Sequence, residues 1–199
     1  MTELSFRCRC GRVRGALHDL APDRGSRVVC YCDDCRAFAR HLGRADLLDA
    51  HGGSDIFQVA PAQVRLSAGA EQLACVRLKP DGMLRWYTRC CQTPLGNTVS
   101  GAVPFVGLPT ALLTEALAGR GADEVLGPAV GVQGRFATPA PAPGAHAAAP
   151  FGLMLRVVKN LVRWKLTGRA RPSPYFDAAG RPLAEPAVLM PAARAALAD

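Results

Sequence analysis

The chain has 199 residues, eight of them cysteines, and a formal net charge of +8. This length suits one domain, or one domain with an extension. No apolar run reaches the roughly 18 residues that a membrane-spanning helix needs, so we expect no transmembrane segment. The positive charge favours anionic partners such as small acidic metabolites, nucleic acid or a membrane surface, and it does not choose among them.

Short strands are expected in the first part of the chain, and each leads to cysteines. Residues 4–17 have the pattern of strand, turn and strand, with Cys8, Cys10 and Gly11 at the turn. A second short strand over residues 27–31 leads to the three cysteines of a C-x-C-x-x-C motif, and a short helix is expected over residues 36–42. The cysteines therefore lie where the chain turns, which suits metal-binding loops.

The region from residue 54 to residue 99 has a β pattern. Apolar and polar residues alternate in part, and Pro80-Asp81-Gly82 is a turn signal between two strand-like runs. The run at residues 84–87 leads to Cys90 and Cys91, which places a third cysteine cluster at the end of a strand. The expected fold class is therefore mainly β.

The last third of the chain has a different character. A helix is expected over residues 108–117, followed by an Ala/Pro-rich connector over 136–150. Residues 151–166 form the clearest amphipathic helix, with Gly168 as its natural end. We therefore divide the chain into a zinc-binding β domain (1–135), the connector (136–150) and a C-terminal extension of helix and basic tail (151–199).

Seven of the eight cysteines lie in the three clusters, and this spacing indicates zinc. Disulfides are the main alternative. The start of the chain, Met1-Thr2-Glu3-Leu4, has no basic and apolar leader pattern, so we expect a cytoplasmic protein with reduced thiols. Cys75 stands apart in an apolar stretch and is expected to be a small buried side chain.

The motifs together resemble a known family. They are Cys8-Arg9-Cys10-Gly11, Cys30-Tyr31-Cys32-Asp33-Asp34-Cys35-Arg36 and Cys91-Gln92-Thr93-Pro94-Leu95. Over roughly half of the chain, this set resembles the glutathione-dependent formaldehyde-activating enzymes, a family that includes centromere protein V. The C-terminal residues resemble an uncharacterised bacterial branch of the same superfamily. The resemblance implies an Mss4-like zinc-binding β fold, here with a C-terminal helical extension.

The resemblance also implies two zinc ions with different roles. Cys8 and Cys10 would hold a structural ion together with a later cysteine pair, and the triad of Cys30, Cys32 and Cys35 would hold a reactive ion with one open position. The third cluster departs from the family pattern, because Thr88 stands where the first cysteine of a C-x-x-C is expected. Either Cys90 joins Cys91 as the fourth ligand, or that site has three sulfurs and another donor.

The function implied by the resemblance is that of a carbon–sulfur lyase. Its substrate would be a glutathione–aldehyde adduct of the S-hydroxymethylglutathione type, with the triad as the catalytic site and a small thiol such as glutathione as its partner. Arg36, Arg40 or His41 could attract a carboxylate of the substrate, although solvated surface residues are the simpler interpretation.

Two other interpretations compete with catalysis. The protein could be a non-catalytic, zinc-stabilised module that binds protein, nucleic acid or an anionic surface. Nucleic acid is the weakest of these, because aromatic residues do not alternate with the basic ones. The apolar face of the 151–166 helix could also meet a second copy in a homo-oligomer. Finally, both zinc sites could be structural, with Cys75, Asp33 or Asp34 as a fourth ligand of the triad.

Overall fold

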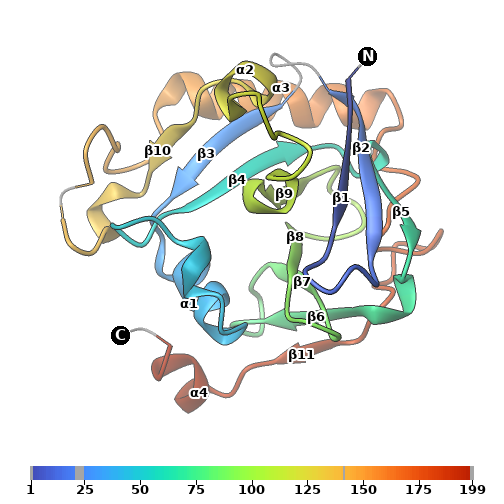
Figure 1. Ribbon diagram of the computed structural model, residues 1–199, viewed down its shortest axis with the longest axis horizontal. Coiled ribbons are helices and arrows are strands. Elements are labelled where there is room, and N and C mark those ends of the chain that lie inside the picture. Colours follow the sequence, from blue (N-terminus) through green and yellow to red (C-terminus); the bar gives the residue numbers. More distant parts are fainter. Residues whose placement is uncertain (1, 21–24, 141, 198–199) are drawn as a thin grey trace.

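The computed structural model describes residues 2–20, 25–140 and 142–197, and within them the fold is mainly β, as the sequence predicts. Eleven strands form two sheets. In Figure 1 the smaller sheet lies on one side of the molecule, opposite the first helix. Its strands are antiparallel and lie in the order β1 (Thr2–Arg7), β2 (Arg14–Leu20) and β5 (Val64–Ala68).

The larger sheet has eight strands. Its inner neighbours pair antiparallel, while its two edge strands, β10 and β11, pair parallel with β3 and β6. The order across the sheet is β10 (Val130–Val132), β3 (Ser26–Cys30), β4 (Ser54–Val59), β9 (Val106–Pro109), β8 (Pro94–Thr98), β7 (Leu84–Thr88), β6 (Leu73–Arg77) and β11 (Pro186–Val188).

Four α-helices are described: α1 (Asp33–His41), α2 (Ala122–Leu126), α3 (Phe151–Leu166) and α4 (Pro191–Ala195). None of them is long and apolar enough to cross a membrane, in the part of the chain that the structure describes. The helix expected over residues 108–117 is wrong. Its first residues belong to β9, and a short 3₁₀-helix, Thr110–Leu113, follows. Leu108 is buried in this central strand, and Leu112 and Leu113 are buried in the 3₁₀-helix. Periodicity alone does not distinguish such a short apolar run from a buried helix.

The main core fills the space between the two sheets. Leu4 and Leu17 of the small sheet and Phe57 and Trp86 of the large sheet are almost completely buried in one cluster. Residues of both sheets thus share one core.

The C-terminal extension is integrated into this core. The ring of Tyr175 lies 5.1 Å from that of Trp86, between ring centroids, and its hydroxyl donates a 2.8 Å hydrogen bond to the carbonyl oxygen of Leu95. Phe176 packs edge-on against Trp86, and β11 adds a strand to the large sheet. The boundaries at 135 and 150 therefore do not separate independent cores.

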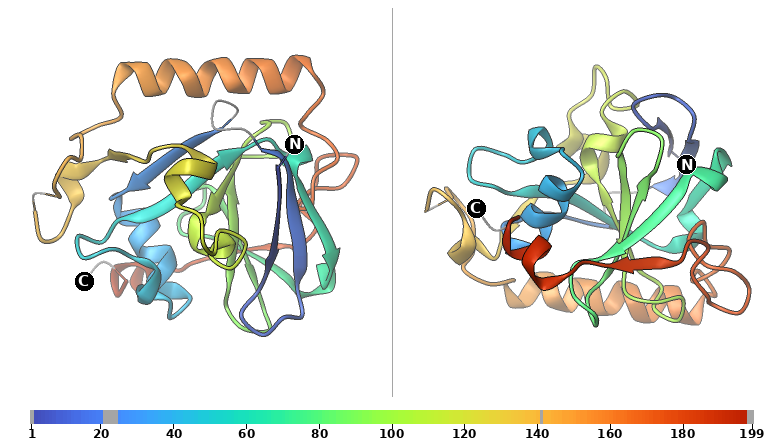
Figure 2. Two further views of the ribbon diagram at one scale, coloured as in Figure 1. Left: turned by 45° about the horizontal axis from the view of Figure 1, so that its top comes forward. Right: turned by 90° about the horizontal axis from the view of Figure 1, so that it is seen from below.

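Helix α3 has the bounds that the sequence predicts, and it lies along the outside of the molecule in both views of Figure 2. It ends in a Schellman motif: Gly168 adopts a φ of +69°, and the amide of Arg169 donates to the carbonyl of Trp164. Trp164 and Asn160 are buried on its inner side. A stripe of large apolar residues along α3 stays exposed, namely Phe151, Met154, Leu155, Val158, Val162 and Leu166, and Met154 and Val158 also border the space between α3 and the large sheet.

Candidate metal centres

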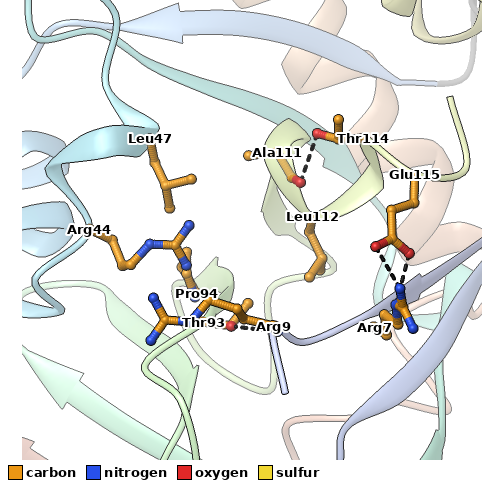
Figure 3. A pocket seen from close by; sticks show the side chains of 10 residues that line it. All are labelled: Arg7, Arg9, Arg44, Leu47, Thr93, Pro94, Ala111, Leu112, Thr114 and Glu115. Atoms are coloured by element: carbon orange, nitrogen blue, oxygen red, sulfur yellow. Dashed lines mark hydrogen bonds and ion pairs between the residues drawn. The ribbon is translucent and has the colours of Figure 1, made fainter. Parts of the chain in front are cut away.

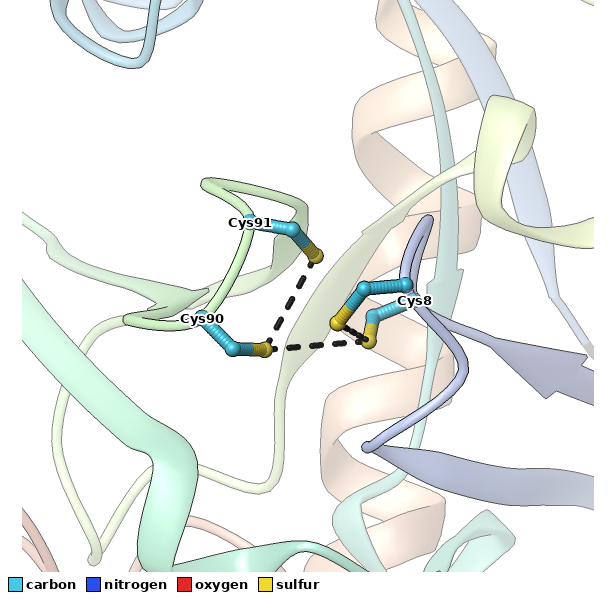
Figure 4. Close-up of side chains that lie close together, drawn as sticks. Cys8, Cys90 and Cys91 are labelled. Carbon is cyan, nitrogen blue, oxygen red and sulfur yellow. Dashed lines mark hydrogen bonds between the residues drawn. The ribbon is translucent and has the colours of Figure 1, made fainter.

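Four cysteines from two distant turns bring their sulfur atoms together. Cys8 and Cys10 lie at the turn between β1 and β2, and Cys90 and Cys91 lie at the turn between β7 and β8. Figure 4 shows the sulfurs of Cys90 and Cys91 pointing toward that of Cys8. The Sγ of Cys8 is 3.6 Å from that of Cys10 and 3.9 Å from that of Cys90, and the sulfurs of Cys90 and Cys91 are 3.8 Å apart. All four atoms lie within 4.8 Å of one another.

These distances fit a tetrahedral thiolate site. Four sulfurs placed about 2.3 Å from one ion would lie about 3.8 Å from each other. Of the two alternatives for the third cluster, the geometry favours Cys90 as the fourth donor. Thr88 lies beside the sulfurs without supplying one, since its Oγ1 is 3.4 Å from the Sγ of Cys91.

Polar neighbours of this group favour thiolates. The amide of Val13 donates to the Sγ of Cys8 over 3.3 Å, and the hydroxyl of Thr93 lies 3.2 Å from the Sγ of Cys91. Burial raises the pKa of the Cys91 thiol, but hydrogen bonds from Thr88 and Thr93 outweigh this effect and bring the pKa to about 5. The surroundings therefore stabilise negative sulfur at Cys91, whereas burial raises the pKa of the Cys90 thiol to about 12.

The second group consists of Cys30, Cys32 and Cys35. Cys30 is the last residue of β3, Cys32 is the N-cap of α1, and Cys35 lies in the first turn of that helix. Their sulfurs lie within 4.8 Å of one another. The amide of Cys35 donates to the carbonyl oxygen of Cys32 over 3.0 Å, which fixes the turn that brings the two thiols together.

The surroundings favour one thiolate in this triad, at Cys32. Hydrogen bonding to Cys32 raises the pKa of Cys30 to about 11, and hydrogen bonding to Cys30 raises that of Cys35. Hydrogen bonds from the thiols of Cys30 and then Cys35 lower the pKa of Cys32 strongly, and the positive charge of Arg85 adds to this effect. The N-terminus of α1 contributes in the same direction, since the helix dipole stabilises negative charge there. Three sulfurs can hold a divalent ion and leave one position for another ligand.

None of the further donors that the sequence suggested for the triad completes it in the described residues. Cys75 is buried in the main core, where burial raises the pKa of its thiol to about 12. Within the described residues, neither Cys75 nor the carboxylates of Asp33 and Asp34 complete a four-donor group with the triad. Asp34 is instead paired with Arg194, its Oδ1 lying 2.9 Å from Nη2.

The three cationic candidates on α1 also have structural contacts. Arg36 is buried and donates to Asp33 and to the carbonyl oxygen of Phe136. Arg40 donates to the carbonyl oxygen of Leu197, and His41 packs edge-on against the ring of Tyr87. None of the three lines the cavity beside the triad.

That cavity has a volume of about 430 Å³ and runs between the large sheet and α3. The three triad cysteines form part of its wall, and most of the remaining lining is apolar. Two buried polar residues, Arg85 of β7 and Asn97 of β8, face it from directly opposite positions on neighbouring strands. Neither residue belongs to a motif that the sequence predicts to be functional. The available signal was a cation and an amide in strands that are otherwise buried on both faces.

A second cavity, of about 310 Å³, lies near the four-cysteine group. Its arginines are already partly neutralised, as Figure 3 shows for the pair of Arg7 and Glu115. Arg44 is paired with Asp46 in the same way. This second cavity has no cysteine in its lining, so the cavity beside the triad is the better candidate for chemistry.

The comparisons with known proteins give a family and no activity. No curated protein matches the sequence. A crystal structure of a Rhodobacter sphaeroides protein, a structural genomics target, is similar over 56% of this chain and 88% of its own, with 18% sequence identity and a TM-score of 0.40. The model of a family of unknown function, DUF6151, matches residues 2–187. The chain therefore belongs to the DUF6151 family.

Proposed function

We propose that this is a zinc protein with one closed, structural ion and one open, reactive ion. Cys8, Cys10, Cys90 and Cys91 would hold the first, and Cys30, Cys32 and Cys35 the second. Sulfur-only donor sets favour zinc over magnesium or calcium, which prefer oxygen. The number of sulfurs in each group supports the division of roles, since four close a tetrahedral site and three leave a position free.

We further propose that the triad binds a thiol and takes part in carbon–sulfur bond chemistry, as in lyases that act on glutathione–aldehyde adducts. The observation that carries this proposal is the position of the triad in the wall of a cavity large enough for an organic ligand. Bound zinc would lower the pKa of a thiol at its open position. The chain itself would contribute the guanidinium of Arg85 against the negative charge of the thiolates, and apolar walls that exclude water.

Zinc content tests the proposal directly. We expect two zinc ions per chain in the wild type, one in Cys32→Ser, and two in the control Cys75→Ala, whose cysteine lies outside both groups. Glutathione should change the spectrum of a cobalt-substituted triad in the wild type and have no effect on Cys32→Ser. The proposal would be contradicted if the wild type held one zinc ion. It would also be contradicted if the wild type held two ions, Cys32→Ser retained both, and glutathione did not change the cobalt spectrum.

A second candidate function, a non-catalytic module that binds an anionic surface, is supported by helix α3. Its exposed apolar stripe, Phe151 to Leu166, is flanked by four exposed cations, Arg156, Lys159, Arg163 and Lys165. Within the described residues none of these cations pairs with a carboxylate, and no acidic residue occurs from residue 125 to residue 176. This arrangement is typical of helices that lie in an anionic membrane surface, whereas a second copy would bring like charges together.

Vesicle binding distinguishes this candidate from the first. The wild type should sediment with vesicles of phosphatidylglycerol and not with those of phosphatidylcholine, and Leu155→Ser/Val162→Ser should lose this binding. Leu183→Ser is the matched control, because Leu183 is equally exposed but lies outside α3. The membrane role would be refuted if Leu183→Ser lost as much vesicle binding as the α3 variant. It would also be refuted if the protein formed concentration-dependent dimers without lipid.

A further inference from the structure

The cavity beside the triad has an apolar wall that a small polar substrate would not use. Its lining includes Val28, Ile56, Phe105, Val132, Leu153 and Val157, contributed by both the large sheet and α3. A volume of about 430 Å³ falls in the range of sites for organic ligands of drug size. Formaldehyde or its hydrate would leave almost all of this wall without a contact.

The same cavity holds a buried cation that forms no ion pair among the described residues. The carboxylate of Asp34 also lines the cavity, but it pairs with Arg194 and Lys79. Two arginines are buried in the described part of the chain, and Arg36 has its partner in Asp33, 2.7 Å away. Arg85 is only 4% exposed and has no ion pair among those residues. Its contacts are a 3.4 Å hydrogen bond to the Oδ1 of Asn97 and the ring of Phe38, whose centroid lies 5.4 Å from the guanidinium carbon. A buried charge is costly unless something compensates it.

Metal-bound thiolates of the triad would balance part of this charge but would use few of its donors. A guanidinium has five N–H groups in a planar fork, which two oxygens of one carboxylate match better than thiolate sulfur does. One of these groups already points to Asn97. The amide of Asn97, itself 5% exposed, supplies further hydrogen-bonding capacity at the same point of the cavity.

We propose that this cavity binds an apolar organic acid, with its carboxylate at Arg85 and Asn97 and its hydrocarbon part against the apolar wall. The inference deepens the proposed function, because it assigns a ligand class to the same site. The acid group fixes the ligand beside the triad, and the apolar part supplies most of the contact area.

Calorimetry on the full-length, zinc-loaded protein tests this with octanoate as the probe. Octanoate should bind at one site about tenfold or more tightly than octan-1-ol, because a charge-assisted bidentate contact is lost in the alcohol. Arg85→Gln should remove this preference. Arg65→Gln, an exposed change of the same charge on β5, should leave it intact.

Asn97→Asp gives a second test that does not depend on removing a buried side chain. It places a carboxylate opposite Arg85, where it would form an ion pair with the guanidinium and compete with the carboxylate of the ligand. We expect octanoate to bind at least about tenfold more weakly while octan-1-ol binding and zinc content are retained. Equal affinity for acid and alcohol in the wild type, or unchanged octanoate binding in both Arg85→Gln and Asn97→Asp, would overturn the inference.

The outcomes separate this inference from the proposed function. Octanoate carries no thiol, so its binding should persist in Cys32→Ser even when one zinc ion is lost. If the wild type binds octanoate through Arg85 but its metal ignores thiols, the thiol chemistry is refuted and the acid site stands. If thiols reach the metal and octanoate does not bind, the acid site is refuted alone.

Discussion

Cys90 should be the fourth donor of the closed site, and replacing it with serine should weaken that site selectively. Its sulfur lies 3.9 Å from that of Cys8 and 3.8 Å from that of Cys91, which are the edges of a thiolate tetrahedron. Structural zinc sites contribute about 10–16 kcal/mol, or about 3 kcal/mol for each of four ligands. Loss of one sulfur should therefore weaken zinc binding about a hundredfold, since about 1.4 kcal/mol is a factor of ten.

A rescue variant makes the geometry testable. The Oγ1 of Thr88 is 3.4 Å from the Sγ of Cys91, so a sulfur at this position would lie close to the vacated corner. Thr88→Cys/Cys90→Ser should recover most of the affinity that Cys90→Ser loses. Ser100→Cys/Cys90→Ser has the same number of cysteines, but the new thiol follows β8 in a turn, so this control should not recover affinity.

Competition with a coloured chelator, together with zinc analysis, measures both effects. Cys90→Ser should show one tight and one weakened ion, and the rescue variant two tight ions. Wild-type affinity at both sites in Cys90→Ser would refute the assignment of Cys90 as a ligand. Failure of Thr88→Cys to rescue, with the fold intact, would refute the proposed equivalence of the two positions.

Three further predictions concern the stability of the fold. Tyr175→Phe leaves the buried carbonyl of Leu95 without its donor, which should cost about 1–3 kcal/mol and lower the melting temperature by about 2–4 °C for each kcal/mol; an unchanged melting temperature would refute the integration of the extension. Burial raises the pKa of the Cys75 thiol from its ordinary value of 9.0 to about 12. The buried neutral thiol therefore contributes its full stabilisation of the fold below about pH 9, and this contribution is lost as the pH rises toward 12. The free energy of unfolding in urea should therefore fall by about 2 kcal/mol more in the wild type than in Cys75→Val between about pH 8 and about pH 10.5. An equal fall in both proteins would contradict this. Cys8→Ser should lower the melting temperature more than Cys32→Ser. The group of Cys8 joins segments 82 residues apart, whereas the triad closes a loop within one short segment. The reverse order of melting temperatures would refute the structural role of the first site.

Local patterns in the sequence predicted much of this architecture. The strands that lead to each cysteine cluster and the helix over residues 151–166 follow from alternation, turn residues and helical spacing. The grouping of Cys8 and Cys10 with Cys90 and Cys91 required the family resemblance as well, because no local pattern states which distant turns meet. The stretch over 108–117 and the edge strands β10 and β11 were missed, since a short apolar run takes its conformation from the strands beside it.

Arg85 shows why part of the site could not be predicted. In the sequence it is an ordinary cation between Leu84 and Trp86, and cations at such positions usually face solvent. It is buried because β7 has the main core on one side, while on the other side the ring of Phe38 in α1 lies against the guanidinium at the edge of the cavity. Helices α1 and α3, which are distant in sequence, border that side, so the burial of Arg85 depends on tertiary contacts alone.

Loss of a metal ligand should affect the fold differently at the two cysteine groups. The closed group connects the turn of the small sheet to a turn of the large sheet, so any loss of a ligand there loosens the packing between them. The triad is formed by the end of β3 and the start of α1, whose positions are fixed by pairing with β4 and by the hydrogen bond from Tyr31 to Val132. A ligand could therefore bind or leave at the triad without a change in the fold, as a reactive centre requires, and the apolar cavity with its buried cation opens at this group rather than at the closed one.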